Sequence, residues 1–128
     1  MSVIKSKRGL SGVQFLDTAR ELHLFTLRTC AKFPKRYTFF ITNNIIQSAS
    51  LIHGYVKRGN SIFPSCPENK KMRYEQFVMA GAELQNLISQ INIAYEIFPI
   101  ADKVMTKWMQ LINSEIGLLR ALVKKEKQ

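Results

Sequence analysis

Apolar residues recur every three or four positions along most of the chain, which is the spacing of one face of an α-helix. The pattern is interrupted at three places, each of which contains proline: Phe33-Pro34, residues 60–67 and Phe98-Pro99. Proline removes a backbone donor and disfavours helical geometry in the preceding residue, so helices end at such points. We therefore predict four helices, at about 11–32, 35–59, 67–97 and 100–125.

The residues at the ends of these segments match the preferences of helix termini. Ser11 can cap the first helix, Gly59-Asn60 predicts the end of the second, and Pro67 suits a first turn. Four long helices with short connections favour a single all-α domain, an up-down-up-down antiparallel four-helix bundle. We expect residues 1–10 to be a basic N-terminal arm and residues 126–128 a basic tail.

The fourth predicted helix carries more apolar residues than one buried face requires. One stripe contains Val104, Trp108, Leu111, Leu118 and Leu122. A second stripe, which we predict to be an oligomer interface, contains Met105, Met109, Ile112, Ile116, Leu119 and Val123. A helix at the surface of a monomer needs one buried stripe, and large exposed apolar patches rarely stay unpaired. The alternative is that both stripes face one wide core.

The charge of the chain points to a class of partner. Nineteen Lys and Arg residues stand against nine acids, which gives a net charge of +10 and a pI near 9.9. Such an excess in a small domain indicates a polyanionic partner, RNA or DNA rather than a membrane, although a well-solvated surface is the alternative. The candidate phosphate contacts are the cations near the helix ends: Arg28, Lys32, Lys35, Arg36, Lys57, Arg58, Lys70, Lys71, Arg73, Lys124 and Lys125.

In an antiparallel bundle these cations form two groups, one at each end of the molecule. The first surrounds Phe33-Pro34, and the second surrounds residues 60–67 and the chain termini. The three cations at residues 70–73 stand at a helix N-terminus, where positive charge opposes the helix dipole. An anionic partner at this place is one explanation of that arrangement. Tyr37 and Tyr74 adjoin the two groups and can stack on unpaired bases.

The residues form no catalytic or metal-binding pattern, so we predict a binding protein without a cofactor rather than an enzyme. His23 and His53 stand on separate predicted helices, with no further His, Cys or carboxylate at ligand spacing. Cys30 and Cys66 form no CxxC pair, and we expect two reduced thiols. Because the sequence shows neither a secretion signal nor a bilayer-spanning apolar run, we expect a soluble, cytoplasmic protein.

Two short motifs carry a resemblance to a known family. The connection Cys30-Ala-Lys-Phe-Pro-Lys-Arg-Tyr37, followed by Val56-Lys-Arg-Gly-Asn60 at the end of the second helix, resembles one group of four-helix-bundle proteins. The group contains the accessory variability determinant (Avd) proteins of diversity-generating retroelements and the proteins encoded in intervening sequences of bacterial 23S ribosomal RNA genes. Its layout matches about residues 10–125. The intervening-sequence branch has a Pro-Asn-Ile-Ala-Glu-Gly-like stretch where this chain has Gln47-Ser-Ala-Ser-Leu-Ile-His-Gly54, which favours the Avd branch.

The resemblance implies a specific role. It implies a basic, barrel-like homopentamer that binds nucleic acid and the reverse transcriptase of the retroelement, and that supports mutagenic copying of template RNA into a variable gene. Two other interpretations stay open. The chain could be an adaptor whose charge docks an acidic protein, or an intervening-sequence protein with another role.

Overall fold

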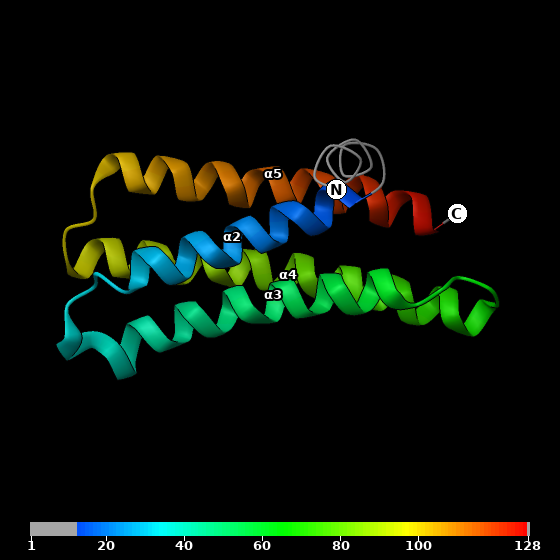
Figure 1. Ribbon diagram of the computed structural model, residues 1–128, viewed down its shortest axis with the longest axis horizontal. Helices are drawn as coiled ribbons and strands as arrows, with labels where there is room; N and C mark the ends of the chain where they lie inside the picture. The colour runs from blue at the N-terminus through cyan, green and yellow to red at the C-terminus, as the bar shows by residue number, and fades with distance from the viewer. Residues whose placement is uncertain (1–12, 128) are drawn as a thin grey trace, which may run out of the picture.

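The computed structural model describes residues 13–127, the side chain of Lys127 excepted, and this part of the chain forms four long α-helices and no β-strand (Figure 1). The helices are α2 (Gln14–Cys30), α3 (Asn43–Ser61), α4 (Pro67–Ile97) and α5 (Asp102–Lys127). The prediction of an all-helical chain with four helices is therefore confirmed. The predicted arm at residues 1–10 and the predicted cap Ser11 lie outside the described residues.

Each helix packs on its neighbours in the sequence, and α2 also packs on α5, so the four helices surround one core. The α2–α3 and α4–α5 connections lie at one end of the molecule, whereas the α3–α4 connection and the end of α5 lie at the other (Figure 1). We refer to residues 28–42 and 97–107 as the corner end, and to residues 55–76 and 116–127 as the terminal end.

The core is apolar, and its one tryptophan has a polar partner. Trp108 on α5 is fully buried, and its indole N–H donates to Thr26 Oγ1 on α2 over 2.9 Å. Phe15 and Phe77 meet edge to face with their ring centroids 5.6 Å apart, which joins α2 to α4. Burial of each large side chain stabilises the fold by about 1.5 to 3 kcal/mol, so these contacts fix the positions of the helices.

The chain between α2 and α3 is not the regular helix that we expected from residue 35. It forms a 3₁₀ turn, η2 (Lys35–Tyr37), and a π-helical turn, η3 (Thr38–Thr42). Phe33 meets the ring of Phe98 edge to face at 4.7 Å, and Tyr37 stacks on it at 5.3 Å. These aromatic contacts hold the connection against the end of α4. The chain must then change direction to enter α3, and the wide π-helical turn of η3 accommodates this change.

Gly59 is not the helix-ending residue that the sequence suggested, because α3 continues through Ser61. No glycine in residues 13–127 has a positive φ, so Gly59 does not use its conformational freedom. Instead it is buried, and a Cβ atom built there would lie 2.5 Å from Cε1 of Phe77 on α4. The glycine therefore marks a close approach of two helices.

The fourth helix is shifted relative to its expected range. α5 begins at Asp102 rather than at residue 100, and it continues to Lys127. Glu126, which we assigned to a basic tail, is part of the helix and forms an ion pair with Arg73 on α4, with 3.1 Å between Oε2 and Nε. No helix in residues 13–127 combines the length and apolarity needed to cross a membrane.

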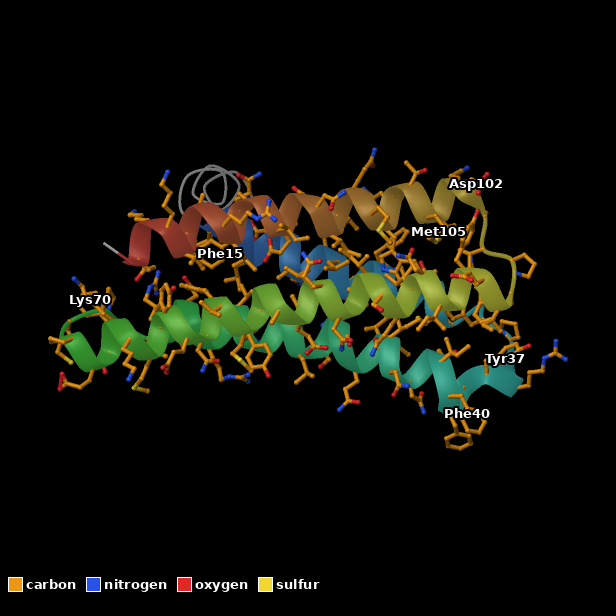
Figure 2. All side chains as sticks on the ribbon, turned by 180° about the vertical axis from the view of Figure 1, so that it is seen from behind. Phe15, Tyr37, Phe40, Lys70, Asp102 and Met105 are labelled. Carbon is orange, nitrogen blue, oxygen red and sulfur yellow. The ribbon has the colours of Figure 1, made fainter. Side chains whose placement is uncertain are left out.

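The stripe that we predicted as an oligomer interface faces the core of its own chain. Ile112 and Leu119 are buried, and the other four members (Met105, Met109, Ile116 and Val123) are half-buried and packed against the core. Met105 lies on the side of α5 that faces the other helices (Figure 2). An interface role is therefore wrong for Ile112 and Leu119, because α5 packs against both α2 and α4 and two contact surfaces need two apolar stripes. The same packing accounts for the apolar character of the four half-buried members without a second subunit.

Candidate nucleic-acid interface

Two long stretches of the chain lack cations. Neither residues 37–56 nor residues 74–102 contain a Lys or Arg, and these stretches supply most of α3 and α4. The cations of the described residues therefore lie on α2, on α5, and at the two ends of the molecule. A +10 protein with this distribution has basic regions and a cation-free region, which we define as η3, residues 43–56 of α3 and residues 74–97 of α4.

At the corner end the helices bring the predicted cations together. Four predicted cations are exposed there: Arg28 on the last turn of α2, Lys32 in the turn that follows it, and Lys35 and Arg36 in η2. The structure adds Lys103 and Lys107, which are exposed on the first turns of α5 at the same end. Sequence reasoning missed these two because they stand about 70 residues further along the chain, and only the direction of α5 places them here.

At the terminal end six of the predicted cations are exposed: Lys57, Arg58, Lys70, Lys71, Lys124 and Lys125. Lys70 lies at the tip, at the opposite end from Tyr37 (Figure 2). Arg58 is held in place, because its Nε–H donates to Gln76 Oε1 at 3.1 Å and its guanidinium lies 4.9 Å from the Tyr55 ring centroid. The terminal end thus presents exposed cations from α3, α4 and α5, of which Arg58 is held by neighbouring side chains.

Arg73 does not belong to this exposed set. Only 14% of its side chain is exposed, and its Nη1 donates to the carbonyls of Gly59 (2.9 Å) and Ile62 (3.2 Å). Its guanidinium also lies over Phe77 and pairs with Glu126. The guanidinium therefore donates to carbonyls at the C-terminus of α3, where a cation is favourable. Arg73 joins three helices, and we remove it from the candidate phosphate contacts.

The tyrosines proposed for base stacking are less available than the sequence suggested. Tyr37 is half-buried: one ring contact is the stacked Phe98, and the Arg36 guanidinium lies 5.1 Å from its centroid. Tyr74 is also half-buried. Because the π-face of Tyr37 is already in contact with the protein, an unpaired base has to find its stacking partner elsewhere.

The two histidines, which we expected to be isolated, meet between α2 and α3. The Nδ1 atoms of His23 and His53 are 2.9 Å apart, so one of them donates a hydrogen bond to the other. Burial lowers the pKa of both, and for His53 the nearby His23, Lys57 and Arg20 lower it further. Both rings are therefore mainly neutral near pH 7. No three His, Cys, Asp or Glu side chains gather as a metal site within residues 13–127.

Glu115 on α5 is the most unusual titratable group of the core. Its side chain is 0% exposed, and neither carboxyl oxygen has a hydrogen-bond partner. Burial alone raises its pKa to about 8, so the carboxyl holds its proton at neutral pH. Burial also raises the pKa of the Cys30 thiol to about 12, which makes that sulfur a poor nucleophile.

A polar cluster joins α3 to α4 in the cation-free region. Ser48 Oγ lies 2.7 Å from Glu83 Oε2 and 2.9 Å from Gln90 Oε1, and Asn86 Nδ2 donates to Glu83 Oε2 at 2.9 Å. The Ser48 hydroxyl has one hydrogen, so it donates to one of its two neighbours at a time. The cluster satisfies buried polar atoms between two packed helices and fixes their register.

Large apolar side chains are exposed beside this cluster. Phe39 and Phe40 in η3 are 81% and 79% exposed, and Ile93 and Ile97 on α4 are about half exposed. Phe40 and Ile93 share a small pocket of about 90 Å³. Phe40 points away from the helices at the corner end (Figure 2). The exposed apolar surface of the chain therefore lies partly in its cation-free region, and not on α5.

Comparison with known proteins adds no assignment. The chain matches none of the protein-family models, curated proteins or solved structures against which it was compared.

Proposed function

We propose that this chain is a nucleic-acid-binding accessory protein of a diversity-generating retroelement, acting in the cytoplasm without catalysing a reaction itself. The observation that carries the proposal is the collection of exposed Lys and Arg side chains at the two ends of a helical molecule. Such cations neutralise phosphates and release counterions without reading base sequence. The phosphate backbones of both RNA and DNA can bind to such cations.

The proposal includes an up-down-up-down antiparallel four-helix bundle as the scaffold. It is supported by contacts between elements that are distant in sequence. Phe98, at the end of α4, packs on Phe33 after α2, and Arg73, at the start of α4, pairs with Glu126 near the end of α5. This course would bring cations of α2, η2 and α5 to one end and cations of α3, α4 and α5 to the other.

The test is a salt titration of binding to a labelled RNA and a labelled DNA. The variant Lys70→Gln/Lys71→Gln removes two exposed cations from the terminal end and leaves Arg73 and its structural contacts intact. We expect weaker binding and a slope of log K against log salt that is smaller by roughly 1.5, because each lost phosphate contact removes about 0.7 to 0.9.

A matched control separates a local site from net charge. Asn113→Glu/Ser114→Glu lowers the net charge by the same two units at exposed positions in the middle of α5, away from both ends and outside the cation-free region. This control should bind nearly as the unaltered protein does. Equal weakening by both double variants, or no salt-dependent binding in the unaltered protein, would contradict the proposal.

The resemblance adds the partners. We propose a homopentamer that associates with the reverse transcriptase and with template RNA or its DNA copy during mutagenic retrohoming. Co-purification of the chain with a reverse transcriptase encoded beside it, and near-identical repeats in the neighbouring DNA, are the observations to seek. A location of the gene inside a 23S ribosomal RNA gene would instead favour the intervening-sequence branch.

An adaptor that docks an acidic protein is the second candidate function. The exposed Phe39 and Phe40, directly after Lys35 and Arg36, favour it because apolar anchors beside cations are typical of protein contacts. The adaptor predicts no appreciable affinity for RNA or DNA at physiological salt, so the same titration distinguishes the two functions.

A further inference from the structure

A pocket of about 350 Å³ lies at the corner end, between the last turns of α2 and the α4–α5 connection. Its walls are apolar and include Phe25, Phe33, Ile100 and Val104. Two segments that are far apart in the sequence, residues 25–33 and 99–104, contribute to it, so the pocket exists only in the folded chain. Its volume lies at the lower end of the range for ligand sites.

The aromatic residues that line the pocket pack against the buried Trp108. Phe25 and Phe33 each lie 6.1 Å from the ring of Trp108, and the indole N–H is fixed by Thr26. Both phenylalanines are only half-buried, so part of each ring remains open. Since buried contacts fix both rings, the pocket is preformed, and a planar ligand can stack there without ordering a mobile side chain.

Two cations stand at the rim. Arg28, on the last turn of α2, and Lys32, two residues beyond its end, both line the pocket and are exposed. No acid lines the pocket. The nearest acid in sequence, Asp102, accepts a hydrogen bond from the Tyr95 hydroxyl at 3.0 Å. The rim therefore favours an anion, while the walls favour an apolar ring.

We propose that this pocket takes an unpaired nucleobase of single-stranded RNA or DNA, with the adjoining phosphates on Arg28 and Lys32. This inference rests on the proposed function and specifies its ligand. A base has a planar apolar body next to an anionic backbone, which matches the aromatic walls and cationic rim. A base within a duplex is paired and stacked and cannot enter. The modest volume suits one ring system better than a long acyl chain.

A second pocket shows why the aromatic walls matter. It measures about 490 Å³, lies between α4 and α5, and also has an Arg and a Lys four residues apart at its edge, Arg120 and Lys124. Its only aromatic residue is Phe77, which is 0% exposed and offers no free ring face. Both of these pockets have cations beside apolar walls, but of the two the one at the corner end has the stacking surface.

The experiment compares a single-stranded oligonucleotide of about twelve bases with a duplex of the same length, by fluorescence anisotropy. Ala101→Phe places a ring in the pocket without changing charge, since Ala101 lines it and is exposed. The matched control, Gly81→Leu, fills the second pocket, where a Cβ atom meets nothing within 4 Å. We expect Ala101→Phe to weaken single-strand binding roughly tenfold, as loss of one stacked base does, and to leave duplex binding unchanged. Gly81→Leu should change neither.

An abasic strand tests the same point on the unaltered protein, independently of how any variant folds. It should bind about as weakly as the normal strand binds to Ala101→Phe. Equal affinity of the unaltered protein for normal and abasic strands overturns the pocket inference while the proposed function stands. Absence of salt-dependent binding to both strand types overturns the proposed function itself. If Ala101→Phe weakens binding to phosphatidylglycerol vesicles but not to single strands, the pocket holds an acyl chain and the inference is wrong.

Discussion

At the scale of single residues, Glu115 shows how burial changes the chemistry of one side chain. The fold places it in the core without a hydrogen-bond partner. An ionised carboxylate is strongly disfavoured there, so the pKa rises from 4.5 to about 8. In the unfolded chain the group ionises near its ordinary pKa.

This difference predicts a pH dependence of stability. Between about pH 4.5 and 8 the unfolded state loses the Glu115 proton while the folded state keeps it, so the free energy of unfolding falls as pH rises. The resulting decrease in the free energy of unfolding is at most roughly 5 kcal/mol, because a shift of one pKa unit corresponds to 1.36 kcal/mol. Urea denaturation across this range should show the decline, and Glu115→Gln should remove most of it.

The control for this prediction is Glu96→Gln on the exposed surface of α4. It should keep the slope of the unaltered protein. If Glu115→Gln also keeps that slope, the carboxyl is ionised in the folded protein and the account of its environment is wrong.

At the scale of elements, the contact between α3 and α4 depends on the absence of one side chain. Gly59 sits where the helices approach, with the Phe77 ring against its Cα, and Arg73 reaches its carbonyl from α4. Gly81, also in α4, has open space around it. The two glycines therefore have opposite roles although both lie inside α-helices.

Substitution of each glycine by alanine tests this interpretation. Gly81→Ala should stabilise the protein by about 0.5 to 1 kcal/mol, because alanine has the higher helix propensity and meets no neighbour. Gly59→Ala should destabilise it by about 1 to 3 kcal/mol, because the new methyl displaces a buried ring. Thermal unfolding followed by circular dichroism measures both. Two shifts in the stabilising direction would show that α3 and α4 do not approach closely at Gly59.

At the scale of the whole molecule, part of the exposed apolar surface lies in a region that contains no cation. The cation-free region carries Phe39, Phe40, Ile93 and Ile97, whereas the cations gather at the ends and along α2 and α5. Two copies with a charge of +10 repel each other wherever lysines face lysines. The cation-free region is the surface on which that repulsion is smallest, so we place the subunit contact of the proposed oligomer there.

This placement predicts which variants change the oligomeric state. Phe39→Ser/Phe40→Ser should lower the mass measured by light scattering, because it removes the two most exposed apolar side chains. Leu27→Ser, at another exposed apolar position outside the cation-free region, is the control and should leave the mass unchanged. A monomeric unaltered protein, or equal masses for all three chains, would contradict it.

The sequence by itself determined the number of helices, their breaks and the surplus of cations, because proline, helical periodicity and charge are local properties. Even the ends of α4 coincide with the expected residues 67–97, since Pro67 and Phe98-Pro99 delimit it. Only the tertiary structure decided what each helix face meets. In the folded chain the second apolar stripe of α5 packs against the core, and Arg73 on α4 contacts both α3 and α5. The tertiary structure also brought His23 to His53, and Arg28 and Lys32 to Ile100 and Val104. Periodicity specifies a face of a helix, whereas the partner of that face depends on how distant segments pack.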